Sequence, residues 1–281
     1  MHGARELSPY DRRALAEIDA FRKPTQSRAG RALSRITAPA GKAADLVSGS
    51  FVGEAVTRAV EGILSLLNDG ASWSVRTQAI HSEFRARGHA RVHSSGDIHS
   101  LELEQVDRTV GYLAAKYKAL AAAEGAGVGA LGGVAILGDI PLLATLALRA
   151  VNEFAAYYGF DTSLPSERMF ALSVLTLASS PTVAAKQLTL VELSHASAML
   201  SRGAAVGELQ WGASVSAFKT SAEALGMRLT KGKLAQLIPL AGAVVGAGFN
   251  AWYLNEVTHT AYMLYRERFL KERYGGTLPL A

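Results

Sequence analysis

The sequence predicts an all-α protein, a multi-helix bundle built around two glycine-rich apolar central helices. Apolar side chains recur at helical spacing along most of the 281 residues. No segment long enough to form a β-strand alternates between apolar and polar residues. Hydrophobic residues make up 49% of the chain and charged residues 19%, which excludes a disordered protein. The lack of cysteine excludes a disulfide scaffold and any cysteine-ligated metal site.

The N-terminal part carries the whole excess of positive charge. Residues 1–44 hold nine basic and four acidic side chains, whereas residues 45–281 hold 20 of each. We therefore divide the chain into a basic, partly flexible arm (1–44) and a helical domain (45–281). Basic side chains near an anionic lipid surface contribute about 1 kcal/mol each, although a solvated arm without a specific role is equally compatible with this pattern. The residues predicted to face a membrane surface are Arg22, Lys23, Arg28, Arg31 and Arg35.

Helix signals follow one another along the chain. In the arm, Leu15, Ile18 and Phe21 recur at helical spacing. Residues 85–99 are polar and interrupted by glycine, which indicates a loop. Ser163-Leu-Pro opens a helix, because proline suits the first helical position. The predicted helices are Leu7–Phe21, 31–48, 52–68, Trp73–Phe84, Ser100–Glu124, 126–158, 165–177, 181–202, 214–228 and 239–273.

Two charge-poor stretches are predicted to form the centre of the bundle. Leu234–Asn255 contains no charged residue, and Gly125–Arg149 contains only one charged residue, Asp139, before its final arginine. Their glycines recur every four residues, which lets a second helix approach closely. Each stretch is about long enough to cross a bilayer, but each also contains a proline. We expect two buried core helices, with a membrane span or an interfacial hairpin as alternatives. The predicted packing or binding residues are Gly125, Gly129, Gly133, Asp139, Arg149, Gly242, Gly246 and Asn250.

Two of these residues are polar and need a separate interpretation. Asp139 stands two residues before Pro141, a position typical of a helix cap. An ionisable group in an apolar cavity is the alternative. For Asn250, which stands among glycines, we expect a satisfied amide in the core, with a hydrogen bond across helices as the functional alternative.

The chain resembles the EcsC protein family over about residues 50–272. The resemblance rests on Glu124-Gly125, Gly132-Gly133, Asp139-Ile-Pro141, Tyr158-Gly-Phe-Asp161 and Glu167-Arg168, and on Ile238-Pro-Leu-Ala-Gly242 through Asn250. The family is bacterial and is named for an operon that also encodes an ABC-type exporter. Its biochemical activity is not established, although some members carry a peptidase label. The resemblance therefore implies a helical fold and a connection with membranes or secretion, and it supplies no catalytic residues.

Two Glu-x-x-His motifs raise the alternative of a metal site. Glu and His three residues apart lie on one helix face, and ferritin-like proteins use two such motifs plus two further glutamates to bind two metal ions. The second motif, formed by Glu256 and His259, is expected to be buried, because it shares a helix face with the apolar residues Phe249, Trp252 and Met263. Two such motifs arise by chance in about one sequence in sixteen of this composition. The candidate ligands, suited to iron or manganese, are Glu153, Glu192, His195, Glu223, Glu256 and His259.

A further histidine cluster lies in the predicted loop. The spacing of His89, His93 and His99 permits a surface metal site, although a solvated loop is the expected state. No glycine-rich phosphate loop and no Gly-x-Ser-x-Gly nucleophile motif at a strand-to-helix turn is present in this all-helical pattern.

The leading functional prediction is a non-catalytic, membrane-associated helical module that binds lipid or a membrane or transport protein. It needs no cofactor; its partners are a membrane surface, such a protein, or an apolar ligand. Nucleic acid is not expected, because the helical domain is neutral and carries no basic patch interleaved with aromatic residues. The alternatives are a di-metal carboxylate oxidoreductase and a hydrolase. Because no apolar signal region follows the N-terminus, we expect a cytoplasmic protein, peripheral at the inner face of the membrane.

Overall fold

The computed structural model describes residues 6–23, 75–131, 135–179 and 242–275, with isolated residues at 57, 61, 62, 65, 187 and 190. Every regular element in these residues is a helix, which confirms the predicted all-α class. The predicted helices at 31–48 and 214–228 and the domain boundary at residue 44 lie outside the described residues, and only residues 187 and 190 of the predicted helix 181–202 are described. The described helices are α1 (Pro9–Arg22), α4 (Thr77–Ala86), α5 (Ser95–Ile98), α6 (Leu103–Val110), α7 (Leu113–Leu131), α8 (Ala135–Tyr157), α9 (Pro165–Ser179) and α12 (Gly242–Tyr274).

Helix α1 begins and ends for local reasons. The Ser8 hydroxyl accepts from the Asp11 backbone N–H at 3.0 Å, and the Asp11 carboxylate accepts from the Ser8 N–H at 3.3 Å. This reciprocal pair satisfies two free N–H groups of the first turn. The helix ends at Arg22, two residues before Pro24, where the chain cannot continue as a helix. The predicted helix Leu7–Phe21 is confirmed within two residues at each end.

The predicted helix Ser100–Glu124 is divided into α6 and α7. Glu102 caps α6, and its backbone N–H donates to the Gln105 side-chain oxygen at 2.9 Å. Ser100, where the predicted helix begins, instead donates its hydroxyl to the Asp97 carbonyl at 2.6 Å. The chain turns at Gly111 and Tyr112, and α7 then continues past Glu124 to Leu131. The glycine-rich segment therefore begins inside α7, because packing outweighs the low helix propensity of glycine there.

Helix α8 also begins at a position that the sequence does not predict. It starts at Ala135, so that Asp139 lies inside the helix and is not its cap. Pro141 also lies inside the helix, where its ring removes one backbone hydrogen bond. The predicted stop at Gly159 is confirmed. Gly159 has φ +86°, and its N–H and that of Phe160 donate back to Ala156 and Ala155, the arrangement of a Schellman motif.

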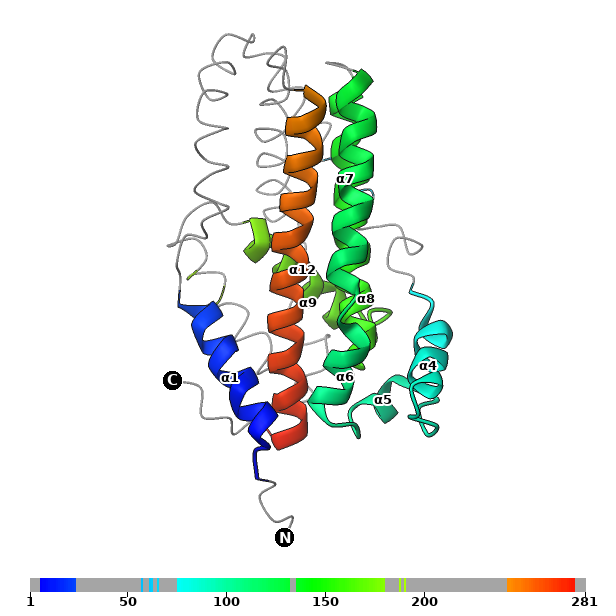
Figure 1. The fold of residues 1–281 in the computed structure, drawn as a ribbon, viewed down its shortest axis with the longest axis vertical. Helices are drawn as coiled ribbons and strands as arrows, with labels where there is room; N and C mark the ends of the chain where they lie inside the picture. Colours follow the sequence, from blue (N-terminus) through cyan, green and yellow to red (C-terminus); the bar gives the residue numbers. More distant parts are fainter. Residues whose placement is uncertain are drawn as a thin grey trace.

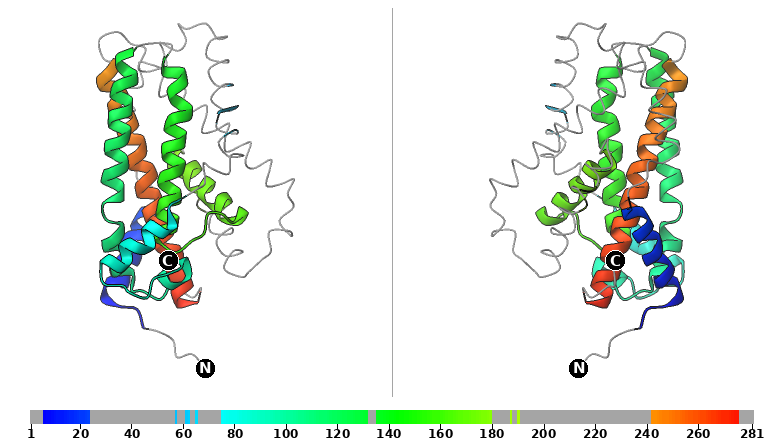
Figure 2. Two further views of the ribbon diagram at one scale, coloured as in Figure 1. Left: turned by 90° about the vertical axis from the view of Figure 1, so that its right-hand side faces the viewer. Right: turned by 90° about the vertical axis from the view of Figure 1, so that its left-hand side faces the viewer.

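The long helices run side by side, with α12 at the centre (Figure 1). Helix α7 runs antiparallel to α12 and makes the most extensive contact with it, while α8 and α9 pack on other sides. Figure 2 shows that the end of α7, the start of α8 and the start of α12 lie together at one end of the bundle, here called the upper end. Helices α1, α4, α5 and α6 surround the opposite, lower end.

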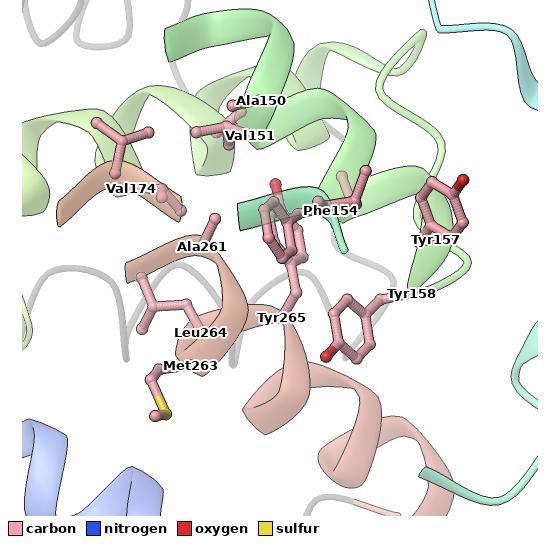
Figure 3. Close-up of a cluster of buried hydrophobic side chains, with 14 of the residues drawn as sticks. Ala150, Val151, Phe154, Tyr157, Tyr158, Val174, Ala261, Met263, Leu264 and Tyr265 are labelled. Carbon is pink, nitrogen blue, oxygen red and sulfur yellow. The ribbon is translucent and has the colours of Figure 1, made fainter. Parts of the chain in front are cut away.

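The core is formed by regularly spaced residues on the central helices. On α12, the buried residues Leu254, Val257, Ala261 and Leu264 continue one stripe. Figure 3 shows side chains of α8 and α9, such as Val151 and Val174, around Ala261 and Tyr265 of α12. On α7, the buried residues recur at every fourth position, namely Leu113, Tyr117, Ala121 and Gly125. The small residues of this stripe suit the close approach of α12.

The prediction of two central glycine-rich helices, 126–158 and 236–272, is only partly testable. Its first segment is divided between α7 and α8, so the predicted continuous helix is wrong. Direct packing of the glycine stripes stays a prediction, because Gly133 and the side-chain environments of Gly129, Gly242 and Gly246 lie outside what the structure describes. Among the described helices, none combines the length and the hydropathy needed to cross a lipid bilayer.

The α7 stripe predicts a clear difference between two neighbouring alanines. Ala121 is fully buried and Ala123 is exposed. Ala121→Leu should lower the free energy of unfolding by about 1–3 kcal/mol, because a larger side chain must push α7 away from its neighbours. Ala123→Leu should change it by less than about 0.5 kcal/mol. Urea denaturation followed by circular dichroism measures both values, and equal effects would contradict the close packing of α7.

Candidate functional site

The structure gives one of the predicted metal ligands an ordinary ionic partner. Glu153 on α8 accepts hydrogen bonds from the Lys116 ammonium on α7, at 2.9 Å to one carboxylate oxygen and 2.7 Å to the other. The pair joins two neighbouring helices. Glu192, His195 and Glu223 lie outside the described residues, so half of the predicted ligand set has no described position.

The second Glu-x-x-His motif is not buried as predicted. The His259 side chain is exposed, with its ring edge-on to Phe21 of α1 at 5.5 Å between centroids, and Glu256 is half-buried. Within the described residues, no three histidine or acidic side chains are grouped so that they could hold a metal ion. The di-metal site therefore stays a prediction that depends on the undescribed residues.

The three histidines of the predicted loop do not form a cluster. His99 points inward, where its Nε2 lies 3.0 Å from the Tyr158 carbonyl oxygen and its ring contacts Phe160 and Phe269. Burial lowers the pKa of His99 below its usual value. His93 remains exposed, and the short helix α5 interrupts the predicted loop. For His99, both predictions are therefore wrong, the surface metal site and the fully solvated loop.

The predicted membrane-facing residues are also divided. Arg22 binds Glu267 of α12 through two hydrogen bonds, at 3.0 and 2.5 Å, and so is engaged within the protein. Lys23 is exposed. Arg28, Arg31 and Arg35 lie outside the described residues. The segment up to Arg22 is therefore a packed helix, while the role of the other arm residues stays a prediction.

The remaining predicted binding residues have contrasting surroundings. Arg149 is exposed on α8, and the side chain of Asp139 is not described. Asn250 is completely buried, yet neither its side-chain nitrogen nor its side-chain oxygen has a hydrogen-bond partner in the part of the chain that is described. The predicted satisfied amide is therefore wrong.

The most strongly charged buried site was not predicted. Arg266, Glu267 and Arg268 are consecutive in α12, and their exposed fractions are only 2%, 3% and 5%. Successive helical residues point about 100° apart, so the three side chains face three directions. Each meets an opposite charge, because a buried charge without a partner is very costly. We call this group the ionic cluster.

Asp107 of α6 is the first partner of the ionic cluster. Its carboxylate lies 2.9 Å from Arg266 Nε and accepts hydrogen bonds from the hydroxyls of Tyr10 at 2.8 Å and Tyr158 at 2.6 Å. Burial raises the pKa of Asp107, while Arg266 and the phenol hydrogen bonds act in the opposite direction. Arg266 also binds Glu17 of α1 at 2.7 Å. One buried carboxylate thus links α1, α6, α12 and the end of α8.

Arg268 and Glu267 complete the ionic cluster on the other sides of α12. Arg268 binds both carboxylate oxygens of Glu167 on α9, at 2.6 and 2.7 Å. Its guanidinium lies over the rings of Phe160 and Phe170, at 4.0 and 4.3 Å from their centroids, which adds a cation–π attraction. Glu267 binds Arg22 of α1, as described above. The ionic contacts therefore tie three helices to α12, namely α1, α6 and α9.

A signal for this cluster was present in the sequence. The three charged residues interrupt an apolar run, from Met263 to Leu270, that would otherwise read as buried on every side. Tyr158, Phe160 and Glu167 all belong to motifs that carried the family resemblance, and all three now contact the cluster or its partners. Their carboxylates, phenols and guanidinium groups bind one another, which is an arrangement suited to holding helices together.

Comparisons with known proteins show which family the chain belongs to. The model of the EcsC protein family matches residues 12–270. The chain belongs to the EcsC protein family. The match begins before residue 50, where the resemblance was expected to start, and so it includes most of α1. No solved structure matches the chain significantly.

Two relatives from Bacillus subtilis cover much of the EcsC-family chain. The uncharacterized protein YdbA is 28% identical over 236 residues, which span 83% of this chain and 84% of YdbA. Protein EcsC is 29% identical over 179 residues, which span 64% of this chain and 70% of that protein. The chain thus resembles these relatives over most of their length.

The buried pair between Arg268 and Glu167 predicts a large loss of stability on one-sided removal. Arg268→Leu should lower the free energy of unfolding by about 3–5 kcal/mol, because Glu167 is left as a buried unpaired charge. The double variant with Glu167→Leu should recover much of this loss. Arg108→Leu, which breaks the exposed pair with Glu104, should cost at most about 0.5 kcal/mol. Chemical denaturation measures all four proteins, and a double variant less stable than Arg268→Leu would contradict the prediction.

The inward position of His99 predicts a pH dependence. Because burial lowers its pKa in the folded state, protonation favours the unfolded chain, and stability should fall as the pH drops below the usual histidine pKa of about 6.5. His99→Gln, which keeps a donor for the Tyr158 carbonyl but cannot titrate, should lose less stability between pH 7 and pH 5 than the unmodified protein. His93→Gln, at an exposed position, serves as the control. Thermal denaturation at several pH values measures the slope, and the prediction fails if His99→Gln leaves it unchanged.

Proposed function

We propose that this EcsC-family protein is a non-catalytic helical module that attaches peripherally to the inner face of a membrane. Its upper end contacts the boundary between headgroups and acyl chains, and the basic residues after α1 contact anionic headgroups. The upper end belongs to a helical bundle and lies only at the surface of the bilayer.

The observation that carries this proposal is the division of charge along the bundle. At the lower end, the ionic cluster and the ion pairs around it bind the helices together. At the upper end, residues 242–255 of α12 contain no charge, and residues 125–148 contain only Asp139. Among the described residues this end is therefore poor in charge, which is typical of proteins that bind an apolar phase.

Two further features support attachment at a lipid surface. Leu142 of α8 lies in the charge-poor part and has 49% of its surface exposed, and burying such a side chain contributes about 25 cal/mol per Å². The arm supplies Lys23, Arg28, Arg31 and Arg35, at about 1 kcal/mol each near anionic lipid. Stable attachment generally needs two such weak signals together.

Flotation with liposomes tests both signals. Leu142→Asp should reduce the fraction that floats with vesicles containing phosphatidylglycerol, because a carboxylate opposes entry into the interface. Leu164→Asp is the matched control, because Leu164 has 50% of its surface exposed but follows the opposite end of α8. Flotation of the control should equal that of the unmodified protein.

The arm is tested in the same assay. The triple variant Arg28→Gln, Arg31→Gln and Arg35→Gln should float less with anionic vesicles, and the difference should shrink as salt is raised. Absence of flotation by the unmodified protein would reject membrane attachment. Flotation that neither Leu142→Asp nor the triple variant reduces would reject the two-signal mechanism.

A further inference from the structure

Helix α1 is attached to the bundle by few apolar side chains and several polar ones. Its buried apolar residues are Ala14, Leu15 and Ile18. The remaining attachment is made by hydrogen bonds and ion pairs, which are sensitive to competing charges where they are partly exposed. These polar contacts are Tyr10 with Asp107, Asp11 with Tyr274, Glu17 with Arg266 and Arg22 with Glu267.

The buried charges that α1 contacts each have a further partner outside α1. Arg266 also binds Asp107 at 2.9 Å, and Asp107 also accepts a hydrogen bond from the Tyr158 hydroxyl at 2.6 Å. Glu267 also binds Lys271, one turn further along α12, at 2.6 Å. Release of α1 therefore leaves each of these charges with a partner and avoids the large cost of an unpaired buried charge.

Helix α9 differs from α1 in this respect. Arg268 and Glu167 bind each other at two positions, and neither has a second ionic partner among the described residues. Detachment of α9 would leave two buried charges unpaired. Separation from α12 is therefore easier for α1 than for α9.

The docked position of α1 keeps its basic end away from the upper end of the bundle. Figure 1 shows α1 beside the lower part of α12, where Arg22 binds Glu267. A helix rises about 1.5 Å per residue, so the stretch of α12 from Gly242 to Glu267 is about 38 Å long. This length is several times the Debye length of about 8 Å in physiological salt. A lipid surface at the upper end therefore attracts Arg22 and Lys23 strongly only after α1 has left α12.

We propose that α1 is a membrane-binding helix that is stored on α12 and is transferred to anionic lipid. On transfer, Arg22 exchanges Glu267 for lipid phosphates, and the exposed Lys23 binds beside it. The apolar face formed by Leu15, Ile18 and Phe21 enters the boundary between headgroups and acyl chains, which replaces the burial lost from α12. This inference rests on the proposed function, to which it adds a further attached element.

Alkylation of a single introduced thiol tests the release, because the chain has no cysteine of its own. Met263 lies one turn after His259 and one turn before Glu267, on the face of α12 that α1 covers, and 9% of its surface is exposed. In Met263→Cys, a water-soluble maleimide should react about tenfold faster with vesicles containing phosphatidylglycerol, the shift expected when two basic residues bind anionic lipid. Vesicles of phosphatidylcholine alone should leave the rate unchanged.

The variant Ala261→Cys is the matched control for this rate. Ala261 is fully buried two residues earlier on α12, where side chains of α8 and α9 surround it (Figure 3). Release of α1 does not uncover this position, so its rate should be the same with and without anionic vesicles. An equal rise in both variants would show a general loosening of the bundle and would overturn a release confined to α1.

A reversible cross-link between α1 and α12 tests whether the release contributes to attachment. The rings of Phe21 and His259 have centroids 5.5 Å apart, so a bifunctional maleimide with a cleavable disulfide spans the variant Phe21→Cys with His259→Cys. The cross-linked protein should float several-fold less with anionic vesicles, and reduction of the cross-link in the same sample should restore flotation. This test and the alkylation use different substitutions, so misfolding of one variant leaves the other test in place.

Two further results would overturn the release of α1. They are an alkylation rate of Met263→Cys that anionic vesicles do not change, and flotation that the cross-link does not reduce. If the unmodified protein floats in these cases and Leu142→Asp reduces its flotation, only the release is rejected. If the unmodified protein does not float at all, the proposed function is rejected together with it.

Discussion

Three consecutive charged residues buried inside α12 constrain the whole structure. Arg266, Glu267 and Arg268 point in different directions from one helix, and burial makes a partner necessary for each. The partners are supplied by α1, α6 and α9. These helices are far apart in sequence, so their docking around α12 is specified by charge as well as by apolar packing. Buried ion pairs often add little net stability compared with apolar replacements. We therefore attribute to these pairs a different role, which is to specify which helix packs against each side of α12.

The same constraint explains the contrast between the two ends of the bundle. Where the ion pairs lie, a sliding or rotating α12 would leave several buried charges unpaired, so the arrangement is fixed. Beyond Asn255, toward the upper end, α12 has no charge that could fix its position. Among the described residues, the ion pairs thus gather at the lower end of the bundle.

The sequence predicts those features of the fold that depend on local chemistry. Pro165 starts α9 and Gly159 ends α8, because proline and glycine restrict or free the backbone within a few residues. The start of α8 at Ala135 was missed, because the sequence indicates Asp139, four residues later, as the cap. The partner of Glu153 is Lys116 on α7, and no local rule can reveal such a contact between two helices.

The buried polar groups of α12 show why a sequence pattern cannot by itself separate structural from functional residues. Arg266 and Asn250 both stand in apolar surroundings and both are buried, so the sequence gives no reason to treat them differently. Their partners distinguish them, because Arg266 meets Asp107 and Glu17 while Asn250 meets no polar group that is described. A satisfied buried group contributes to the native arrangement, whereas an unsatisfied one opposes it.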